Sequence, residues 1–239
     1  MLESQLGTLY FVPTPIGNLE DITLRSLRIL REVAFIYAED TRTSGVLLKK
    51  YEIATPMRAF HSFNEHQALA GIVSLLKSGT DIALISDAGT PGISDPGFLL
   101  ARECNEAKIP YTCLPGATAL IPALVMSGLP VDKFYFEGFL PHKKGRMTRL
   151  KIITASPQTV VLYESPFRLI KCIRELGEHA GPERKAAIIR EISKIHEHCH
   201  AGTLGELLIE LESGKIPTKG EIVIVLDAFQ APKEKESPR

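Results

Sequence analysis

The sequence predicts an α/β protein with two α/β domains, the first built on a mainly parallel sheet and the second on a mixed sheet. The first observation behind this prediction is that short apolar segments alternate with helical patterns along nearly all 239 residues. The second is that the apolar segments follow one another more closely in the C-terminal half, which favours a mixed sheet there. The third is a change of rhythm in PGATALIPALVMSGLP, residues 115–130, which is typical of a helix and connector between two halves.

Short apolar segments bounded by Gly, Pro or polar residues are the predicted strands. They are 8–12, 33–38, 81–86 and 111–114 in the first half, then 133–138, 159–164, 185–191, 197–201 and 221–227. Segments with apolar residues three and four apart are the predicted helices. They are 23–31, 43–50, 64–77, 96–107, 118–126, 146–155, 167–178 and 204–213. We therefore expect one domain over residues 1–116, a second over 117–229, and a disordered charged tail over 230–239.

Composition and charge narrow the classes of function. Lys plus Arg and Asp plus Glu are equal at 28 each, so net charge points to no nucleic-acid partner and any basic surface must be local. No apolar run approaches the roughly 20 residues of a membrane helix, and the N-terminus lacks a signal-peptide pattern. The four cysteines lack Cys-x-x-Cys spacing and are expected to be free thiols. We therefore expect a cytoplasmic protein without a membrane partner.

Four predicted strands of the first domain end in loops that are rich in Gly and Pro or densely polar. The most unusual loop is SDAGTPGISDPG at 86–97, and the others are PTPIGN at 13–18, AEDTR at 38–42 and LPGATA at 114–119. Glycines let backbone groups approach a ligand, and the carboxyl ends of parallel strands meet at one edge of a sheet. The 86–97 loop matches neither Gly-x-Gly-x-x-Gly nor the Walker A sequence. The loops together predict a ligand site, although a tight strand-to-helix connection is the alternative for the 86–97 loop taken alone.

An ordered set of segments resembles the tetrapyrrole methylase superfamily. The set is PTPIGNLEDIT, AEDTRTS, LISDAGTPGISDPG, PGATALIPALVMSGLP, YESPFRL, REISKIHE and PTKGEIVIVL, within residues 7–227. The long SDAGTPGISDPG and YESPFR segments resemble its branch of small-subunit ribosomal RNA methyltransferases. The resemblance implies a cofactor cleft between two α/β domains, S-adenosylmethionine as methyl donor with no metal, and a homodimer. It also implies 2′-O-ribose methylation of a decoding-centre cytidine in 16S rRNA of the small ribosomal subunit.

Carried over by motif, the resemblance implies cofactor contacts in both domains. The implied contacts are Ile16, Asp87, Gly89, Ile93, Thr118 and Ala119 in the first domain and Tyr163, Glu164, Gly220 and Glu221 in the second. The Gly-Pro loop after Asp87 is longer than in the wider superfamily. Structural alternatives exist for single residues: Thr118 as a helix cap and Asp87 as a turn residue. For Tyr163 the structural alternative is a place in the core, and for Gly220 it is the start of a strand.

Methyl transfer from a sulfonium depends mainly on positioning of the two reacting groups. A general base assists a ribose hydroxyl, and Asp40 in the polar loop is the candidate. Arg42 beside it is the candidate for contact with an RNA phosphate, since its planar fork suits that group. The alternative is a salt bridge between Asp40 and Arg42 with no chemical role.

Two further clusters carry charge or potential ligands. Residues 143–151 contain five cations and no acid, so we expect an RNA-binding patch formed by Lys143, Lys144, Arg146 and Arg149. A solvated helix face is the alternative. The run HEHCH at 196–200 would place its histidines on one face of a strand. It lacks a partner motif that completes the four ligands of structural zinc, so we expect no metal there.

Two other functions stay open. One is methylation of a tetrapyrrole-type small molecule on the same scaffold, and the other is a non-catalytic RNA-binding assembly factor. The basic segment and the full SDAGTPGISDPG match favour the RNA methyltransferase over the small-molecule enzyme.

Overall fold

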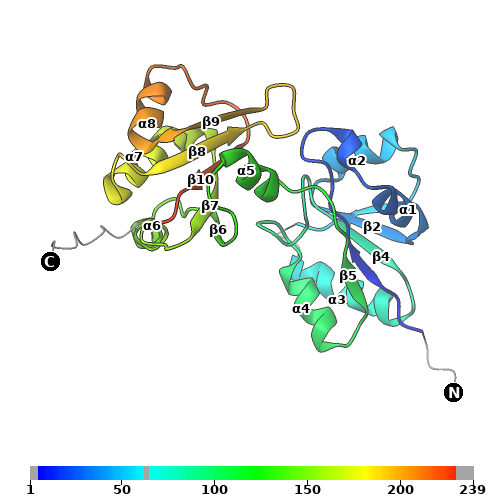
Figure 1. Cartoon of the computed structure of the whole chain (residues 1–239). Coiled ribbons are helices and arrows are strands. Elements are labelled where there is room, and N and C mark those ends of the chain that lie inside the picture. The colour runs from blue at the N-terminus through cyan, green and yellow to red at the C-terminus, as the bar shows by residue number, and fades with distance from the viewer. Residues whose placement is uncertain (1–4, 62–64, 230–239) are drawn as a thin grey trace. The chain divides into compact units, whose positions relative to one another are not determined.

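The computed structural model describes residues 5–61 and 65–229, so the expected disordered tail at 230–239 lies outside the described residues. The chain divides into two compact units, the first ending at Thr118 and the second beginning at Ala119. Each unit contains one five-stranded sheet with helices packed against it (Figure 1). The helices of the described residues include none that is long and apolar enough to cross a membrane.

The first unit is a parallel sheet in the order β3-β2-β4-β1-β5. Its strands are β1 Leu9–Phe11, β2 Phe35–Ala38, β3 Met57–Ala59, β4 Ile82–Ile85 and β5 Tyr111–Cys113. Its helices are the 3-10 helix η1 Leu19–Asp21, then α1 Leu24–Glu32, α2 Thr41–Lys50, α3 Glu65–Lys77 and α4 Phe98–Glu106. Apolar residues of α1 and α2 pack on one face of the sheet and those of α3 and α4 on the other. Central strand β4 is therefore buried throughout, as expected for a parallel sheet covered on both faces.

Strand β3 is the element that the sequence pattern misses. It has three residues, of which Arg58 and Ala59 are exposed, and among the described strands it pairs with β2 alone, at the edge of the sheet. Such a short segment has no apolar alternation, so its strand conformation depends on the neighbouring strand. Helix α2 also begins two residues earlier than expected, because the Asp40 side chain caps it by accepting from the Arg42 backbone N–H.

The second unit is a mixed sheet in the order β6-β7-β10-β8-β9. Its strands are β6 Phe134–Phe139, β7 Thr159–Glu164, β8 Lys185–Arg190, β9 His198–Thr203 and β10 Ile222–Leu226. Its helices are α5 Leu120–Ser127, α6 Arg146–Thr154, the 3-10 helix η2 Pro166–Arg168, α7 Leu169–Ala180 and α8 Leu204–Glu212. Strands β6 and β7 are parallel and the other pairs are antiparallel, so the expected mixed sheet is confirmed.

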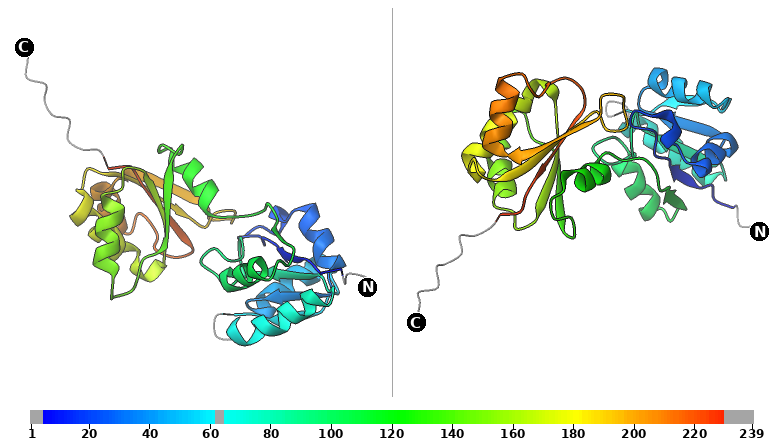
Figure 2. Two further views of the ribbon diagram at one scale, coloured as in Figure 1. Left: turned by 90° about the horizontal axis from the view of Figure 1, so that it is seen from below. Right: turned by 45° about the horizontal axis from the view of Figure 1, so that its top comes forward.

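The two faces of the second sheet are covered by different helices, and each side chain of a strand points to one of these faces. Cross-strand partners share a face and successive residues alternate between faces. One row is Tyr163, Val223, Ile189 and Cys199, and the next row, on the opposite face, is Glu164, Ile222, Arg190 and His198. The Cys199 thiol donates to the Met126 carbonyl of α5 at 3.3 Å, so α5 lies on the first face. Ile222 belongs to the core formed with α6, α7 and α8, which therefore cover the second face (Figure 2).

Candidate functional site

The loops at the carboxyl ends of the first sheet are joined by hydrogen bonds. Thr14 and Gly89 exchange backbone hydrogen bonds of 2.9 Å in both directions, which ties the loop after β1 to the loop after β4. The Thr14 hydroxyl also donates to the Ser86 carbonyl at 3.0 Å. The Thr90 hydroxyl donates to the Ala117 carbonyl at 3.3 Å, which adds the loop after β5. These contacts hold three loops in place before any ligand arrives.

The loop after β2 joins the same edge through Asp87. The Asp40 backbone N–H donates to Asp87 Oδ1 at 3.0 Å. Asp87 itself is exposed at the end of β4, with its carboxylate directed at the β2 loop. The structure thus brings together the strand-end loops that the sequence pattern singles out, as parallel strands require.

Two glycines of the 86–97 loop are needed for its path. Gly89 has φ +80, and a Cβ there would lie 3.6 Å from Ile16 Cγ2. Gly97 has φ +136, and its Cβ would lie 3.0 Å from a Leu84 methyl group and 3.1 Å from the Phe11 ring. Other residues rarely adopt these φ values, so glycine allows the loop to fold closely over the strand ends. Ile16 is 8% exposed in this packing, whereas Ile93 is 46% exposed on the same loop system.

Three acids give this edge its electrostatic character. Burial, followed by repulsion from Glu39 and Asp87, raises the pKa of Asp95 to about 6. Burial and the charge of Asp87 likewise raise the pKa of Glu39. Carboxyl groups that are partly buried close to one another favour a bound cation, because a positive charge relieves their repulsion. Glu39 and Asp95 are absent from the site predicted from sequence, although both stand in the strand-end loops.

The predicted base and its arginine neighbour form a close pair. Arg42 contacts both carboxylate oxygens of Asp40, with Nε at 3.1 Å and Nη2 at 2.7 Å. These hydrogen bonds and the backbone N–H of Arg42 lower the pKa of Asp40 to about 2. The salt bridge that the sequence leaves as the alternative is therefore present. The Arg42 side chain is 90% exposed.

Thr118 and Ala119 stand at the junction of the two units. The N-cap of α5 is Ala119, which makes no side-chain cap hydrogen bond. The alternative that Thr118 caps this helix is therefore wrong. The preceding loop is packed tightly, since a Cβ on Gly116 would lie 2.6 Å from Pro13 Cβ.

The predicted contacts on β7 lie on opposite faces of the second sheet. Tyr163 packs edge-on against Phe136 and Phe139, with ring centroids 5.1 and 5.5 Å apart. The Glu164 side chain is fully buried on the other face. There it bonds to Arg168 Nε at 2.7 Å and lies 3.5 Å from Arg146. Glu164 is thus a buried ion-pair partner in this structure, so its carboxylate is not presented to a ligand.

Gly220 and Glu221 lead into β10 beside Glu191. Gly220 has φ +97, and a Cβ would lie 2.5 Å from the Glu191 carboxylate. Glu191 Oε1 accepts the backbone N–H of Glu221 at 2.8 Å. The Glu221 carboxylate is 69% exposed and lies 3.2 Å from Lys194. Glycine at position 220 is therefore required by the structure itself, because the backbone has a positive φ and lies too close to the Glu191 side chain for a Cβ.

The basic segment divides into exposed and buried cations. Lys143 and Lys144 are exposed. Arg146 is only 4% exposed; its Nε donates to Glu175 Oε2 at 2.8 Å, and its Nη2 lies 2.7 Å from the same oxygen in an ion pair. Arg149 is paired with Glu137. The expected patch of four exposed cations is therefore reduced to the two lysines, because the arginines pair with acids that are distant in sequence.

The histidine run at 196–200 is only partly in a strand. Strand β9 begins at His198, so His196 precedes it, while His198 and His200 share a face and stack with ring centroids 4.1 Å apart. Within 5–61 and 65–229, no three His, Cys, Asp or Glu side chains are grouped so that they could hold a metal ion.

Comparison with known proteins gives the family. The model of the tetrapyrrole (corrin/porphyrin) methylases matches residues 8–208. A protein named ribosomal RNA small subunit methyltransferase I from Pseudomonas aeruginosa is 46% identical over 97% of this chain and 82% of its own length. The protein of the same name from Thermotoga maritima is 44% identical over 92% of this chain and 98% of its own length.

Solved structures show the same fold. Uroporphyrin-III-C-methyltransferase from Thermus thermophilus superposes with a TM-score of 0.63 at 21% identity, covering 92% of this chain and 94% of that protein. Cobalt precorrin-4 methyltransferase, a cobalamin biosynthetic enzyme, has a TM-score of 0.67 at 14% identity with the same coverage. The predicted fold class is therefore confirmed. Since the family model covers most of the chain and the sequence relatives match nearly all of it, the chain belongs to the tetrapyrrole methylase family, in the group of the small-subunit ribosomal RNA methyltransferases I.

Proposed function

We propose that this protein methylates the 2′-hydroxyl of a decoding-centre cytidine in 16S rRNA of the small ribosomal subunit, with S-adenosylmethionine as methyl donor. The observation that carries the proposal is the group of acids Glu39, Asp87 and Asp95 on hydrogen-bonded loops at the carboxyl edge of the first sheet. The choice of RNA as substrate rests on the name of the relatives that match nearly the whole chain.

The residues at this edge fit the proposed methyl donor. S-adenosylmethionine, when bound, supplies a methyl group already activated on a positively charged sulfur. The carboxylates of Asp87 and Asp95 offer the negative charge that a sulfonium and an ammonium group require. Gly89 has no side chain, so a ligand can approach its backbone groups beside Ile16, whose side chain offers an apolar contact. Roles for Ile93, Thr118, Ala119, Tyr163 and Gly220 in binding the same cofactor stay part of this proposal.

Two acids are candidates for the general base. A base works best when its pKa is close to the working pH, and Asp40 is held at a pKa of about 2 by Arg42. Asp95, with a pKa of about 6, is closer to that condition. Both acids therefore stay candidates for the base: Asp95 by its pKa in the free protein, and Asp40, which also caps α2 and orients Arg42. Arg42, highly exposed, remains the proposed contact for an RNA phosphate.

The proposed function is tested by transfer of an isotope-labelled methyl group to small ribosomal subunits that lack the modification. Nucleoside mass spectrometry of the digested RNA should then detect labelled 2′-O-methylcytidine. Subunits that already carry the modification serve as the matched control and should accept no label. Label on a porphyrin precursor would support the small-molecule enzyme instead. Binding of subunits without any transfer would support an assembly factor.

We expect binding of S-adenosylmethionine to release a proton from Asp95 near pH 6. A bound cation favours the carboxylate, so the pKa of Asp95 should fall from about 6 on binding. Affinity should consequently rise with pH up to about 6 and then level off. Calorimetry in buffers of different ionisation enthalpy measures the proton released. Asp95→Asn should abolish the release and Asp132→Asn, at an exposed site in the second unit, should retain it. An equal release from Asp95→Asn would show that another group titrates.

The exposed lysines should contribute to RNA affinity. Each phosphate contact adds roughly 0.7–0.9 to the slope of log affinity against log salt. Changing both Lys143 and Lys144 to alanine should therefore flatten that slope by about one to two contacts while the affinity for S-adenosylmethionine is retained. Filter binding to a 16S rRNA fragment at several salt concentrations measures the slope. An unaltered slope would identify the two lysines as part of a solvated face.

The proposal includes a cytoplasmic homodimer that acts without a metal and without a membrane. The dimer rests on the family resemblance. Light scattering of the purified protein at several concentrations measures the mass, and a monomer at the concentration used for activity would exclude the dimer.

A further inference from the structure

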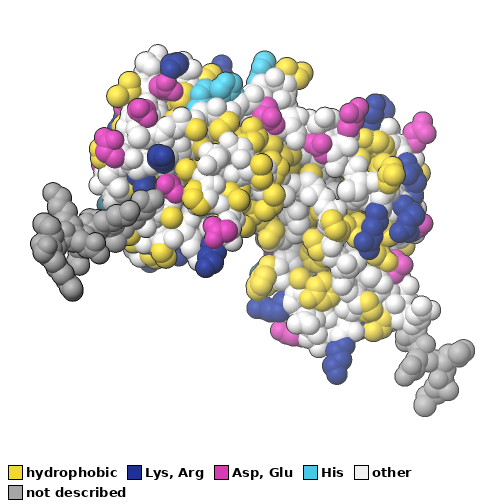
Figure 3. All heavy atoms as spheres, in the orientation of Figure 1, with side chains coloured by type: hydrophobic (Ala, Val, Ile, Leu, Met, Phe, Trp, Pro, Cys, Tyr) yellow, Lys and Arg dark blue, Asp and Glu magenta, His cyan; other side chains and the backbone are white. Residues whose placement is uncertain are grey.

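A pocket of about 610 Å³ opens on the second unit between the end of β8, the start of β9 and residues 215–220. Its lining includes Arg190, His198, His200 and Lys219. Arg190 and His198 belong to the row on the face covered by α6, α7 and α8, whereas Tyr163 lies on the other face. The pocket therefore lies on the opposite face of the sheet from the predicted contact at Tyr163, although Gly220, another predicted contact, is part of its lining. Histidine side chains are visible at the surface of this unit in Figure 3.

Arg190 is the central cation of the pocket. It is only 6% exposed, and its Nη2 donates to the backbone carbonyl of Lys219. Its Nε is buried and has no hydrogen-bond partner among residues 5–61 and 65–229. In the part of the chain that the structure describes, no carboxylate lies within ion-pair distance of Arg190. A buried guanidinium donor without an acceptor is costly, so this group is well suited to an anion that enters from outside.

The two stacked histidines add donors to the same pocket. The rings of His198 and His200 are inclined by 24° with centroids 4.1 Å apart. His200 Nε2 is buried, and no described residue forms a hydrogen bond with it. Burial, followed by the charges of His198 and Arg190, lowers the pKa of His200. An anion that contacts both histidines would relieve this repulsion and favour their protonated forms.

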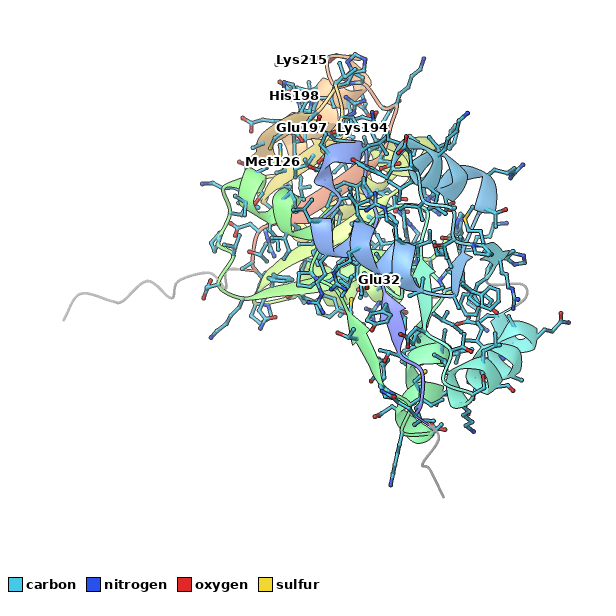
Figure 4. All side chains as sticks on the ribbon, turned by 90° about the vertical axis from the view of Figure 1, so that its right-hand side faces the viewer. Glu32, Met126, Lys194, Glu197, His198 and Lys215 are labelled. Carbon is cyan, nitrogen blue, oxygen red and sulfur yellow. The ribbon has the colours of Figure 1, made fainter. Side chains whose placement is uncertain are left out.

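The two acids that line the pocket, Glu191 and Glu197, each accept from a donor other than Arg190 and the histidines. Glu191 bonds to Lys194 Nζ at 3.0 Å, and Glu197 Oε2 accepts the Ser193 backbone N–H at 2.7 Å. Lys215 is paired with Glu210 of α8. Figure 4 shows Lys194, Glu197, His198 and Lys215 together in this part of the second unit. Among the described residues of the lining, the basic groups that form no ion pair are thus Arg190, Lys219, His196 and the two stacked histidines, although the charge of Glu191 acts on Arg190 and that of Glu210 on His200.

We infer that this pocket binds a phosphate group, and that in the protein's reaction this phosphate belongs to the backbone of the RNA substrate. An arginine fork with adjacent histidine donors matches phosphate oxygens, and charge-assisted hydrogen bonds to them are strong. The pocket is open and large enough to admit a phosphate that remains attached to a chain. The RNA assignment rests on the proposed function, whereas the phosphate assignment stands on the pocket alone.

Binding of inorganic phosphate tests the pocket directly. Arg190→Gln and, separately, His200→Gln should weaken phosphate binding by about 10-fold or more, as expected for loss of a hydrogen bond to a charged group. Lys185→Gln is the matched control, since this exposed lysine stands at the opposite end of β8. Phosphate titrations followed by calorimetry and by NMR of the histidine ring protons give the affinities. Melting temperatures identify any variant that fails to fold, and His200→Gln keeps the test valid if Arg190→Gln unfolds.

The histidines give the binding a pH dependence with a defined sign. Phosphate should bind more tightly as pH falls through the titration of His200, and phosphate should raise the pKa of His200 seen by NMR. The charged and titratable groups that face His200 are Arg190 on β8, His198 on β9, Glu210 on α8 and Lys215 on the following loop. His200→Gln should remove this part of the pH dependence, and Lys185→Gln should leave it in place.

Three results would overturn the inference or part of it. Equal phosphate affinity in wild type, Arg190→Gln and His200→Gln would exclude the pocket as a phosphate site. Displacement of phosphate by S-adenosylmethionine at one equivalent would assign the pocket to the cofactor. Weakened phosphate binding with unchanged affinity for a 16S rRNA fragment would exclude the RNA backbone and leave free phosphate as the ligand. The labelled methyl-transfer assay is independent of all three, so failure of the proposed function is recognised separately.

Discussion

Replacing Arg146 with alanine should lower the free energy of unfolding of the second unit by about 3–5 kcal/mol, the usual cost of removing one partner from a buried ion pair. The Arg146 guanidinium bonds to Glu175 and lies 3.5 Å from the fully buried carboxylate of Glu164. Without Arg146, the described residues leave Glu164 with Arg168 as its cationic partner and Glu175 with Lys171, at 3.7 Å. Chemical denaturation followed by circular dichroism measures the loss.

Lys143→Ala is the matched control for this prediction. It removes a cation three residues earlier in the same basic segment, from an exposed side chain. Exposed substitutions of this kind usually change stability by about 0.5 kcal/mol or less. If Arg146→Ala were no more destabilising than Lys143→Ala, Arg146 would have to be solvated in solution, and its place in the RNA-binding patch would be restored.

Replacing Asp87 with alanine should weaken binding of S-adenosylmethionine by about 10- to 100-fold, the effect of losing a hydrogen bond to a charged group. Asp87 contributes negative charge at the edge where Glu39 and Asp95 also lie, and it holds the β2 loop through the Asp40 backbone N–H at 3.0 Å. Calorimetric titration with the methyl donor measures the affinity, and thermal melting checks the fold.

Asp87→Asn separates the two roles of this side chain. Asparagine keeps an oxygen that accepts from the Asp40 N–H but removes the negative charge. A loss in Asp87→Asn close to that in Asp87→Ala would identify charge as the main contribution. Asp81→Asn is the control at the opposite end of β4, where the Asp81 side chain accepts from the Thr8 N–H at 2.6 Å. Full affinity in both Asp87 variants would reduce Asp87 to a turn residue.

The positions of most helices and strands depend on local sequence and could be predicted from it. Strand β4 is a continuous apolar run bounded by polar residues, as a strand covered on both faces must be. Helix α1 repeats its apolar residues at helical spacing after the capping residue Thr23. Strand β3 was missed because its three residues carry no such pattern and owe their conformation to pairing with β2.

The gathering of the strand-end loops at one edge could also be predicted, because it follows from the topology of a parallel sheet. Loops that follow parallel strands must meet at one edge of the sheet. The segment SDAGTPGISDPG is recognised as such a loop by its glycines and prolines. The acidic character of the edge is different. The raised pKa of Asp95 depends on its burial and on Glu39, which stands 56 positions earlier in the chain, and no local pattern reveals that proximity.

The sequence by itself determined the fold class, the order of its elements, the family and the edge of the sheet at which the strand-end loops gather, because each depends on periodicity or on long motifs. Only the tertiary structure decided which charges are available to a ligand. Arg146 and Lys143 stand in the same basic run, yet Glu164 and Glu175 neutralise the arginine while the lysine stays exposed. Likewise, Arg190 forms no ion pair with an acid among the described residues, and the tertiary structure instead places histidines and the backbone carbonyl of Lys219 at its side. Electrostatic interactions act through space, so their partners are set by the packing of the sheet and not by distance along the chain.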